Sequence, residues 1–218
     1  MKKIYNKTNQ EWHLHSSNDN FWIKWRYDEI LKALNSSGID LNNNYNCLDV
    51  GSGMSNFAEK IERSSNFIVD QFDIDQKLYE KKVTTKGKYY FYDINVKENR
   101  FKNKYDIIFL MDVLEHIEDD KTFFHNLEFY LKNDGKIIIN VPSLQIFYSK
   151  YDIAVGHCRR YTKSSIKKII NQKKYDTKMY YWGLLLIPLL LLRKIINSFQ
   201  DNHDKIISSG MSTKNIVV

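Results

Sequence analysis

Short apolar runs alternate with segments of helical periodicity through the middle of this chain. The clearest run is 105–111, Tyr-Asp-Ile-Ile-Phe-Leu-Met, whose composition is typical of a parallel strand buried on both faces. Strands that alternate with helices over short connections predict a Rossmann-like α/β fold: a doubly wound, mostly parallel sheet with helices on both faces. We predict further strands at 46–50, 67–73, 89–92 and 136–141, and helices that begin near Phe57 and cover 76–82 and 119–131.

Other patterns flank this alternation. Apolar residues at roughly helical spacing predict a helix over 20–35, and a loop rich in tyrosine starts at Ser143. Because no repeat or linker interrupts the chain, we predict a single domain over its 218 residues, with an elaborated helical C-terminal region. Its predicted parts are a helical cap at 1–40, a core at 46–142 and the elaboration at 143–218, which contains helices at 164–171 and 179–196 and a final strand at 214–218.

The chain is basic, with a net charge of +7 and a pI near 9.1. Such a charge favours anionic partners, and solubility from a lysine-rich surface is the alternative. The lysines are scattered with no long basic tract, so we expect no nucleic-acid partner. The two cysteines, Cys47 and Cys158, form no CxxC motif and no Cys/His cluster, so we expect no metal. Because Cys47 lies in a predicted buried strand, we expect no disulfide either. A polar N-terminus without an apolar stretch predicts a cytoplasmic protein.

A glycine-rich turn follows the first predicted strand. The segment 48–53 reads Leu-Asp-Val-Gly-Ser-Gly, and such a turn presents backbone N–H groups to a ligand at a helix N-terminus. The dinucleotide pattern G-x-G-x-x-G fails because its last position is Asn56, and no Walker pattern is present. Asp49, two residues before the first glycine, disfavours a pyrophosphate and suits a ligand that carries an ammonium group and hydroxyls.

The same run resembles the first motif of class I methyltransferases that use S-adenosylmethionine (SAM), with Ser55 in place of the usual third glycine. Asp73 corresponds to the acid that holds the ribose hydroxyls, and its competitor Asp75 is better placed as a helix N-cap. Asp93, followed by Ile94, corresponds to the residue that contacts the adenine amine.

Two later segments extend the resemblance. Residues 111–117, Met-Asp-Val-Leu-Glu-His-Ile, resemble the family's "VLEHI" segment after the fourth strand, and 133–136 match its turn before the fifth strand. These motifs occur in the family's order. The resemblance implies SAM as cofactor, with S-adenosylhomocysteine as product, and it implies the cofactor-binding residues Asp49, Gly51, Ser52, Gly53, Asp73, Ile74, Asp93, Ile94, Met111 and Asp112.

Two histidines are candidate general bases. Methyl transfer to a phenol or sugar hydroxyl benefits from a base, most often histidine. His116 follows the fourth strand, where the acceptor pocket opens in this fold, and a packing role is its alternative. The second candidate is His157, in the segment 156–161, Gly-His-Cys-Arg-Arg-Tyr.

Residues 156–161 resemble the GHxRRY element of bacterial methyltransferases in surface-polysaccharide and lipid-linked glycan pathways. The resemblance implies acceptor binding by Arg159, Arg160 and Tyr161, whose cations suit a carboxylate or phosphate. A solvated basic loop is the alternative. Residues 21–26 resemble the aromatic-plus-arginine opening of these enzymes, which brings Arg26 to the methionine carboxylate, and 12–15 are a candidate lid.

The leading functional prediction is an O-methyltransferase of surface-polysaccharide or lipid-linked sugar biosynthesis, with a small-molecule or glycan acceptor. Nucleic-acid methylation is disfavoured because no Asn/Asp-Pro-Pro-aromatic motif follows the fourth strand and no cysteine follows a proline. Two alternatives remain open: a quinone or phenol O-methyltransferase, and a catalytically silent regulatory subunit that binds SAM.

The apolar stretch 183–192 is shorter than the roughly 20 residues that span a bilayer, and Pro188 interrupts it. We expect a buried helix there. The alternative is peripheral membrane contact through 183–194, at the inner face of the membrane.

Overall fold

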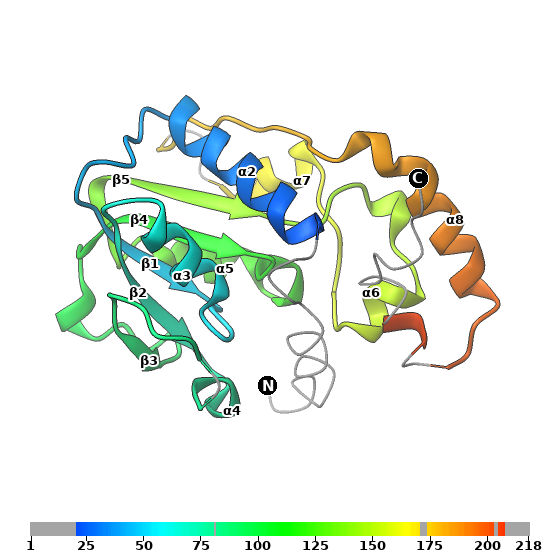
Figure 1. Ribbon diagram of the computed structural model, residues 1–218, viewed down its shortest axis with the longest axis horizontal. Coiled ribbons are helices and arrows are strands. Elements are labelled where there is room, and N and C mark those ends of the chain that lie inside the picture. The colour runs from blue at the N-terminus through cyan, green and yellow to red at the C-terminus, as the bar shows by residue number, and fades with distance from the viewer. Residues whose placement is uncertain (1–20, 81, 171–173, 203–204, 208–218) are drawn as a thin grey trace. The chain divides into compact units, whose positions relative to one another are not determined.

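The computed structural model describes residues 21–80, 82–170, 174–202 and 205–207 (Figure 1). The chain divides into two compact units. The core unit is Asp28–Val141, and the appended unit combines the described parts of Met1–Tyr27 and Pro142–Val218. Helix α2 (Phe21–Ser36) crosses the boundary between them. The organisation of 1–218 as a single domain stays a prediction.

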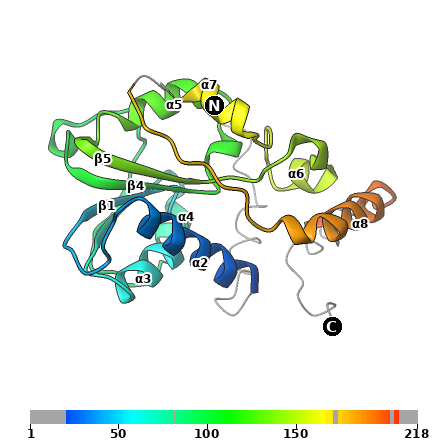
Figure 2. The ribbon, with the colours of Figure 1, turned by 90° about the horizontal axis from the view of Figure 1, so that it is seen from above.

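The core unit is built on a five-stranded sheet in which every neighbouring pair is parallel, in the order β3-β2-β1-β4-β5. Figure 2 shows α3 and α5 on opposite faces of this sheet, so the predicted doubly wound α/β fold is confirmed. The strands are β1 (Asn46–Val50), β2 (Ile68–Asp73), β3 (Tyr89–Phe91), β4 (Tyr105–Met111) and β5 (Leu131–Asn140), and the helices are α3 (Asn56–Arg63), α4 (Gln76–Tyr79), α5 (Asp120–Leu127) and the short 3-10 turns η1 (Asn99–Phe101) and η2 (Leu114–His116).

The strand order places a candidate site at one edge of the sheet. In parallel strands the carboxyl ends share an edge, and Val50 pairs with Phe72 on one side and with Leu110 on the other. The chain extends the sheet from β1 through β2 to β3 and then returns to β4 on the other side of β1. Such a reversal opens a crevice for ligands at the carboxyl ends of β1 and β4.

Two predicted boundaries were wrong. Helix α5 ends at Leu127, four residues before the predicted end, and β5 begins at Leu131. The predicted turn at 133–135 lies inside β5, where the pairing shifts from Tyr105–Leu131 to Ile107–Lys136. The extra residues form a bulge, which carries turn-type residues without ending the strand.

The appended unit contains short helices and one longer one: η3 (Gln145–Phe147), α6 (Lys150–Ala154), α7 (Lys163–Ile169), η4 (Leu184–Leu186) and α8 (Ile187–Ser198). The helix predicted at 179–196 corresponds to α8, which begins only at Ile187 and ends at Ser198. Pro188 lies in the first turn of α8 and does not interrupt it, because the first helical residues have no backbone acceptor for an N–H. Within the described ranges, every helix is too short or too polar to cross a bilayer.

Candidate functional site

The glycine-rich turn after β1 bends sharply over the end of β2. The backbone N–H groups of Gly51 and Ser52 both donate to the carbonyl of Phe72, over 2.8 and 3.3 Å. Gly51 and Gly53 have φ angles of 70° and 57°, a region that side chains disfavour. A Cβ atom at Gly51 would lie 2.7 Å from Cγ2 of Val113, so this glycine also lets the turn after β4 approach closely.

Ser55, which the resemblance places at the third glycine of the motif, has a glycine-like backbone. Its φ is 69°, and this left-handed conformation costs a non-glycine residue roughly 1–2 kcal/mol. The side chain is fully buried, and its Oγ atom forms no hydrogen bond with the described residues. The backbone geometry explains why glycine is usual here, and the buried hydroxyl adds a polar atom beside the turn.

Asp73, the last residue of β2, holds the glycine turn in place. One carboxylate oxygen accepts the N–H of Gly53 over 2.8 Å, and the other accepts the N–H of Asp75 over 2.8 Å. On the other side of the same turn, the Tyr89 hydroxyl donates to the Gly53 carbonyl over 3.1 Å. Burial raises the pKa of Asp73, and the two backbone donors oppose that rise. A carboxylate has about four lone-pair positions, so Asp73 retains capacity for two further donors.

Asp75 has the role that its position predicts. Its side chain accepts the backbone N–H of Lys77 over 2.9 Å and caps α4. Asp49 lies in the middle of β1 and is buried. Its negative charge, together with that of Asp73, contributes to the raised pKa of Tyr89, for which burial is the largest cause. Two buried carboxylates therefore give the region around Tyr89 a negative potential.

Asp93, which is predicted to contact adenine, and its neighbour Ile94 follow the end of β3. Asp93 is exposed, and its carboxylate accepts both the backbone N–H and the side-chain amide of Asn95, over 2.9 and 2.8 Å. Ile94 is buried, whereas Ile74, which follows β2, is 47% exposed. Exposed apolar surface at Ile74 fits a role against a ligand better than Ile94 does, because Ile94 already packs into the core.

Asp112 follows β4 with a φ of 59°, another left-handed backbone in this turn region. Its carboxylate accepts the side-chain amide of Asn140 over 2.5 Å, which fixes its direction from the end of β5. Met111, at the end of β4, is half-buried. His116 ends η2 and is also half-buried, with its backbone N–H bonded to the carbonyl of Val113.

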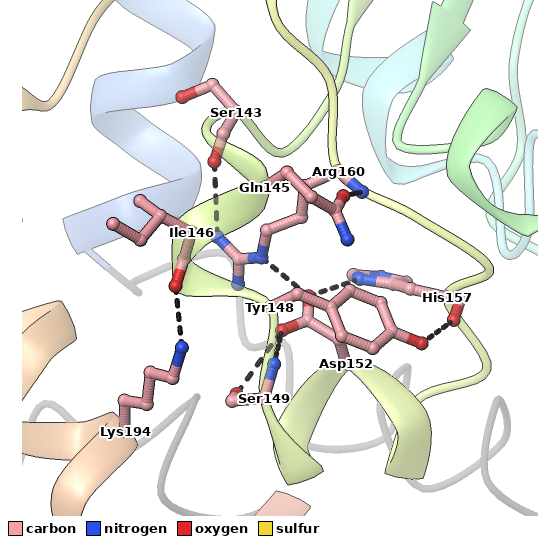
Figure 3. A network of polar contacts seen from close by, with 9 residues as sticks. All are labelled: Ser143, Gln145, Ile146, Tyr148, Ser149, Asp152, His157, Arg160 and Lys194. Carbon is pink, nitrogen blue, oxygen red and sulfur yellow. Dashed lines mark hydrogen bonds and ion pairs between the residues drawn. The ribbon is translucent and has the colours of Figure 1, made fainter.

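In the appended unit, His157 is held by a buried carboxylate (Figure 3). Nδ1 of His157 lies 2.9 Å from Oδ1 of Asp152, which is fully buried in α6. The Tyr148 hydroxyl donates to the His157 carbonyl over 2.7 Å, so the backbone is anchored as well. The Asp152 contact turns the other ring nitrogen, Nε2, away from this carboxylate.

Arg160 belongs to the same network. It is buried, and its Nε atom donates to Oδ1 of Asp152 over 2.8 Å. Burial alone raises the pKa of Asp152, but the hydrogen bond from His157 and the charge of Arg160 outweigh it and hold the pKa below its usual value. These contacts favour a structural role for Arg160 over the acceptor binding predicted for it. Tyr161 is also buried, whereas Arg159 is half-buried.

The contacts of two residues at these sites could not be predicted from the sequence. Tyr89 lies in an aromatic strand segment, and nothing in that pattern indicates a bond to the glycine turn. Asp152 precedes His157 by five residues, a separation with no recognisable motif. Arg26 lies in α2 and is half-buried; its contact with a methionine carboxylate stays a prediction. The candidate lid at 12–15 and the candidate strand at 214–218 lie outside the described residues.

Comparison with known proteins agrees with the fold. A family model described as a methyltransferase domain matches residues 21–177, while curated protein sequences returned no match. The structure is similar to phosphoethanolamine N-methyltransferase 2 of Haemonchus contortus in complex with SAM, with a TM-score of 0.64 and 19% identity over 94% of this chain and 52% of that chain.

Two further structures have the same fold. The YcgJ protein of Bacillus subtilis matches with a TM-score of 0.61 and 14% identity over 84% of this chain and 83% of that chain. The N-methyltransferase NodS of Bradyrhizobium japonicum, in complex with S-adenosylhomocysteine, matches with a TM-score of 0.55 and 16% identity over 76% of this chain and 85% of that chain.

Proposed function

The chain belongs to the methyltransferase-domain family and is a SAM-dependent enzyme of that family; from this premise we propose that it methylates a hydroxyl group of a glycan acceptor. The acceptor class we favour is a surface polysaccharide or a lipid-linked sugar. The cofactor and the acceptor place different demands on the protein, and different residues support each part of the proposal.

The turn after β1 fits the adenosyl cofactor. Gly51 lacks a Cβ atom where one would collide with Val113, so the turns after β1 and β4 approach each other closely at the carboxyl end of the sheet. Asp73 retains lone pairs for the ribose hydroxyls, and Asp49 adds negative charge that attracts a cationic amino-acid end. When bound, SAM supplies an electrophilic methyl group on a sulfonium; the protein orients the acceptor for in-line attack and excludes water.

The contact between Asp152 and His157 is the observation that supports a hydroxyl acceptor. A hydroxyl must lose its proton as it attacks the methyl group, and a positioned histidine accelerates such transfers by about 10²–10⁴-fold. With Nδ1 directed at a buried carboxylate, Nε2 is the nitrogen that takes the proton, and the carboxylate stabilises the imidazolium that forms. The same base also serves a phenol, so a quinone-type acceptor remains the second candidate.

Arg159 supports an anionic group on the acceptor. It precedes the buried Arg160 and is itself only half-buried, so part of its side chain is exposed to solvent. A guanidinium binds a phosphate or carboxylate with two parallel hydrogen bonds. A sugar carried on a phosphate or diphosphate would offer such a group close to its hydroxyls. The proposal therefore assigns acceptor binding chiefly to Arg159 and proton removal to His157.

The test supplies the full-length protein with methyl-labelled SAM and three acceptor pools: glycolipids extracted from cell envelopes, phenolic lipids, and small amines. We expect label in the glycolipid pool. The labelled methyl group should be carried on a hydroxyl oxygen as a methyl ether, which is stable to mild acid and base. Label confined to the amines would overturn the hydroxyl proposal, and label in the phenolic pool would favour the second candidate. SAM binding with label in no pool would favour the silent regulatory subunit.

A further inference from the structure

Helix α8 turns an apolar face to the solvent. Six large apolar side chains of this helix and its cap are between 43% and 85% exposed, and helical geometry places them on one arc of about 160°. They are Leu189, Leu191, Leu192, Ile195, Ile196 and Phe199. Leu185, in the preceding turn η4, is 88% exposed. The sequence-based expectation of a buried helix at 183–192 was therefore wrong.

The opposite face of α8 carries the polar groups and packs against the appended unit. The guanidinium of Arg193 lies 4.4 Å from the ring centre of Tyr151. The ammonium group of Lys194 donates to the carbonyl of Ile146 over 2.6 Å (Figure 3). Asn197 is buried. The two cations of the helix thus anchor it by contacts to an aromatic ring and a backbone carbonyl.

This arrangement is the reverse of the usual one. A helix on the surface of a soluble protein buries its apolar stripe and exposes its charges. Here the exposed part of each leucine and isoleucine forgoes the free energy of burial, and a single contiguous apolar patch of this kind marks an interaction surface. We propose that α8 and η4 form a membrane-docking surface that lies in the interface of a bilayer containing anionic lipids.

Three features favour lipid over a protein partner. Protein interfaces carry about one hydrogen bond per 100–200 Å², yet the six side chains on the exposed arc offer no donor or acceptor. The segment 177–200 contains no aspartate or glutamate, and the whole chain has a net charge of +7. Tyr180 and Tyr181 are exposed just before η4, and such side chains prefer the level of the lipid headgroups.

The length of the helix agrees with docking in the plane of the interface. Helix α8 has 12 residues, which at about 1.5 Å per residue cannot cross the roughly 30 Å of a hydrocarbon core. An apolar face of this size sinks about 5–10 Å into the boundary between headgroups and acyl chains. The inference goes beyond the proposed function, because binding to lipid does not depend on which acceptor is methylated.

The test is flotation of the full-length protein with vesicles of phosphatidylcholine, with and without phosphatidylglycerol, in the absence of SAM and acceptor. We expect binding to the anionic vesicles, and we expect Leu192→Glu combined with Ile195→Glu to lower the partition coefficient at least about tenfold. Ile68→Glu is the matched control, since Ile68 is an equally apolar side chain, 47% exposed, at the amino end of β2. It should bind as the wild type does.

A second measurement, tryptophan fluorescence, uses a variant that keeps the docking surface apolar. Phe199→Trp places an indole at a position that is 85% exposed, and its emission should shift to the blue and be quenched by brominated lipids. Lack of vesicle binding by the wild type, or equal binding by the double variant, would overturn the proposal. A wild-type dimer that the double variant separates, without vesicle binding, would overturn it too and assign the surface to a second copy of the chain.

Discussion

Gly51→Val is expected to abolish binding of S-adenosylhomocysteine in a calorimetric titration. The left-handed backbone at this position disfavours any side chain, and a β-branched one most of all. In addition, the new Cβ atom would lie 2.7 Å from Cγ2 of Val113, a stiff side chain at the turn after β4. Relief of that contact moves one of the two turns that flank the crevice and disturbs the bonds from Gly51 and Gly53 that fix the turn and the Asp73 carboxylate beside it.

Gly38→Val separates this effect from backbone strain alone. Gly38 has a similar φ of 74°, but a Cβ atom there meets nothing within 4 Å. Both substitutions should lower thermal stability through the strained backbone, by an amount on the order of 1–3 kcal/mol. Only the Gly51 variant should lose the ligand. If both variants bind with wild-type affinity, the turn after β1 is not the cofactor site.

His157→Ala is expected to lower kcat by about 10²–10⁴-fold while the affinity for SAM stays unchanged. The ring is positioned by the buried Asp152, and its loss removes the proton acceptor without touching the turn after β1. Initial rates with labelled SAM, set beside a calorimetric titration of the same preparation, measure the two effects separately.

His125→Ala is the control, because His125 lies on α5 with a side chain that is 75% exposed. It should retain full turnover. Normal turnover in His157→Ala would make His157 a structural residue and leave His116 as the candidate base. Loss of SAM affinity together with turnover would show that the substitution damages the fold rather than the proton transfer.

Much of the core unit follows from the sequence, for physical reasons. Parallel strands buried on both faces are mostly apolar, so β1 and β4 stand out from their surroundings even though each contains one aspartate. The carboxyl ends of such strands share one edge, and polar residues that follow each strand must gather there. Asp73 and Asp112 are placed in this way, and the cap at Asp75 follows from the ordinary preference for aspartate before a helix.

Other features could not be predicted because they depend on tertiary packing. The bulge in β5 carries residues typical of a turn, and only the pairing with β4 shows that the strand continues through them. Helix α6 has five residues, too few to show periodicity, so Asp152 appeared in no predicted element. For α8, hydropathy indicated an apolar helix correctly, but it carries no information on which face packs inward.

The most direct test of the cofactor site is a calorimetric titration of S-adenosylhomocysteine into the wild type, Asp73→Ala and Asp40→Ala. The two aspartates share a local role, since each accepts the N–H of the residue two positions later, but only Asp73 also holds Gly53. We predict saturable binding at one site in the wild type and in Asp40→Ala, and no detectable binding in Asp73→Ala. Equal affinity in all three proteins would contradict the assignment of the SAM site to the turn after β1.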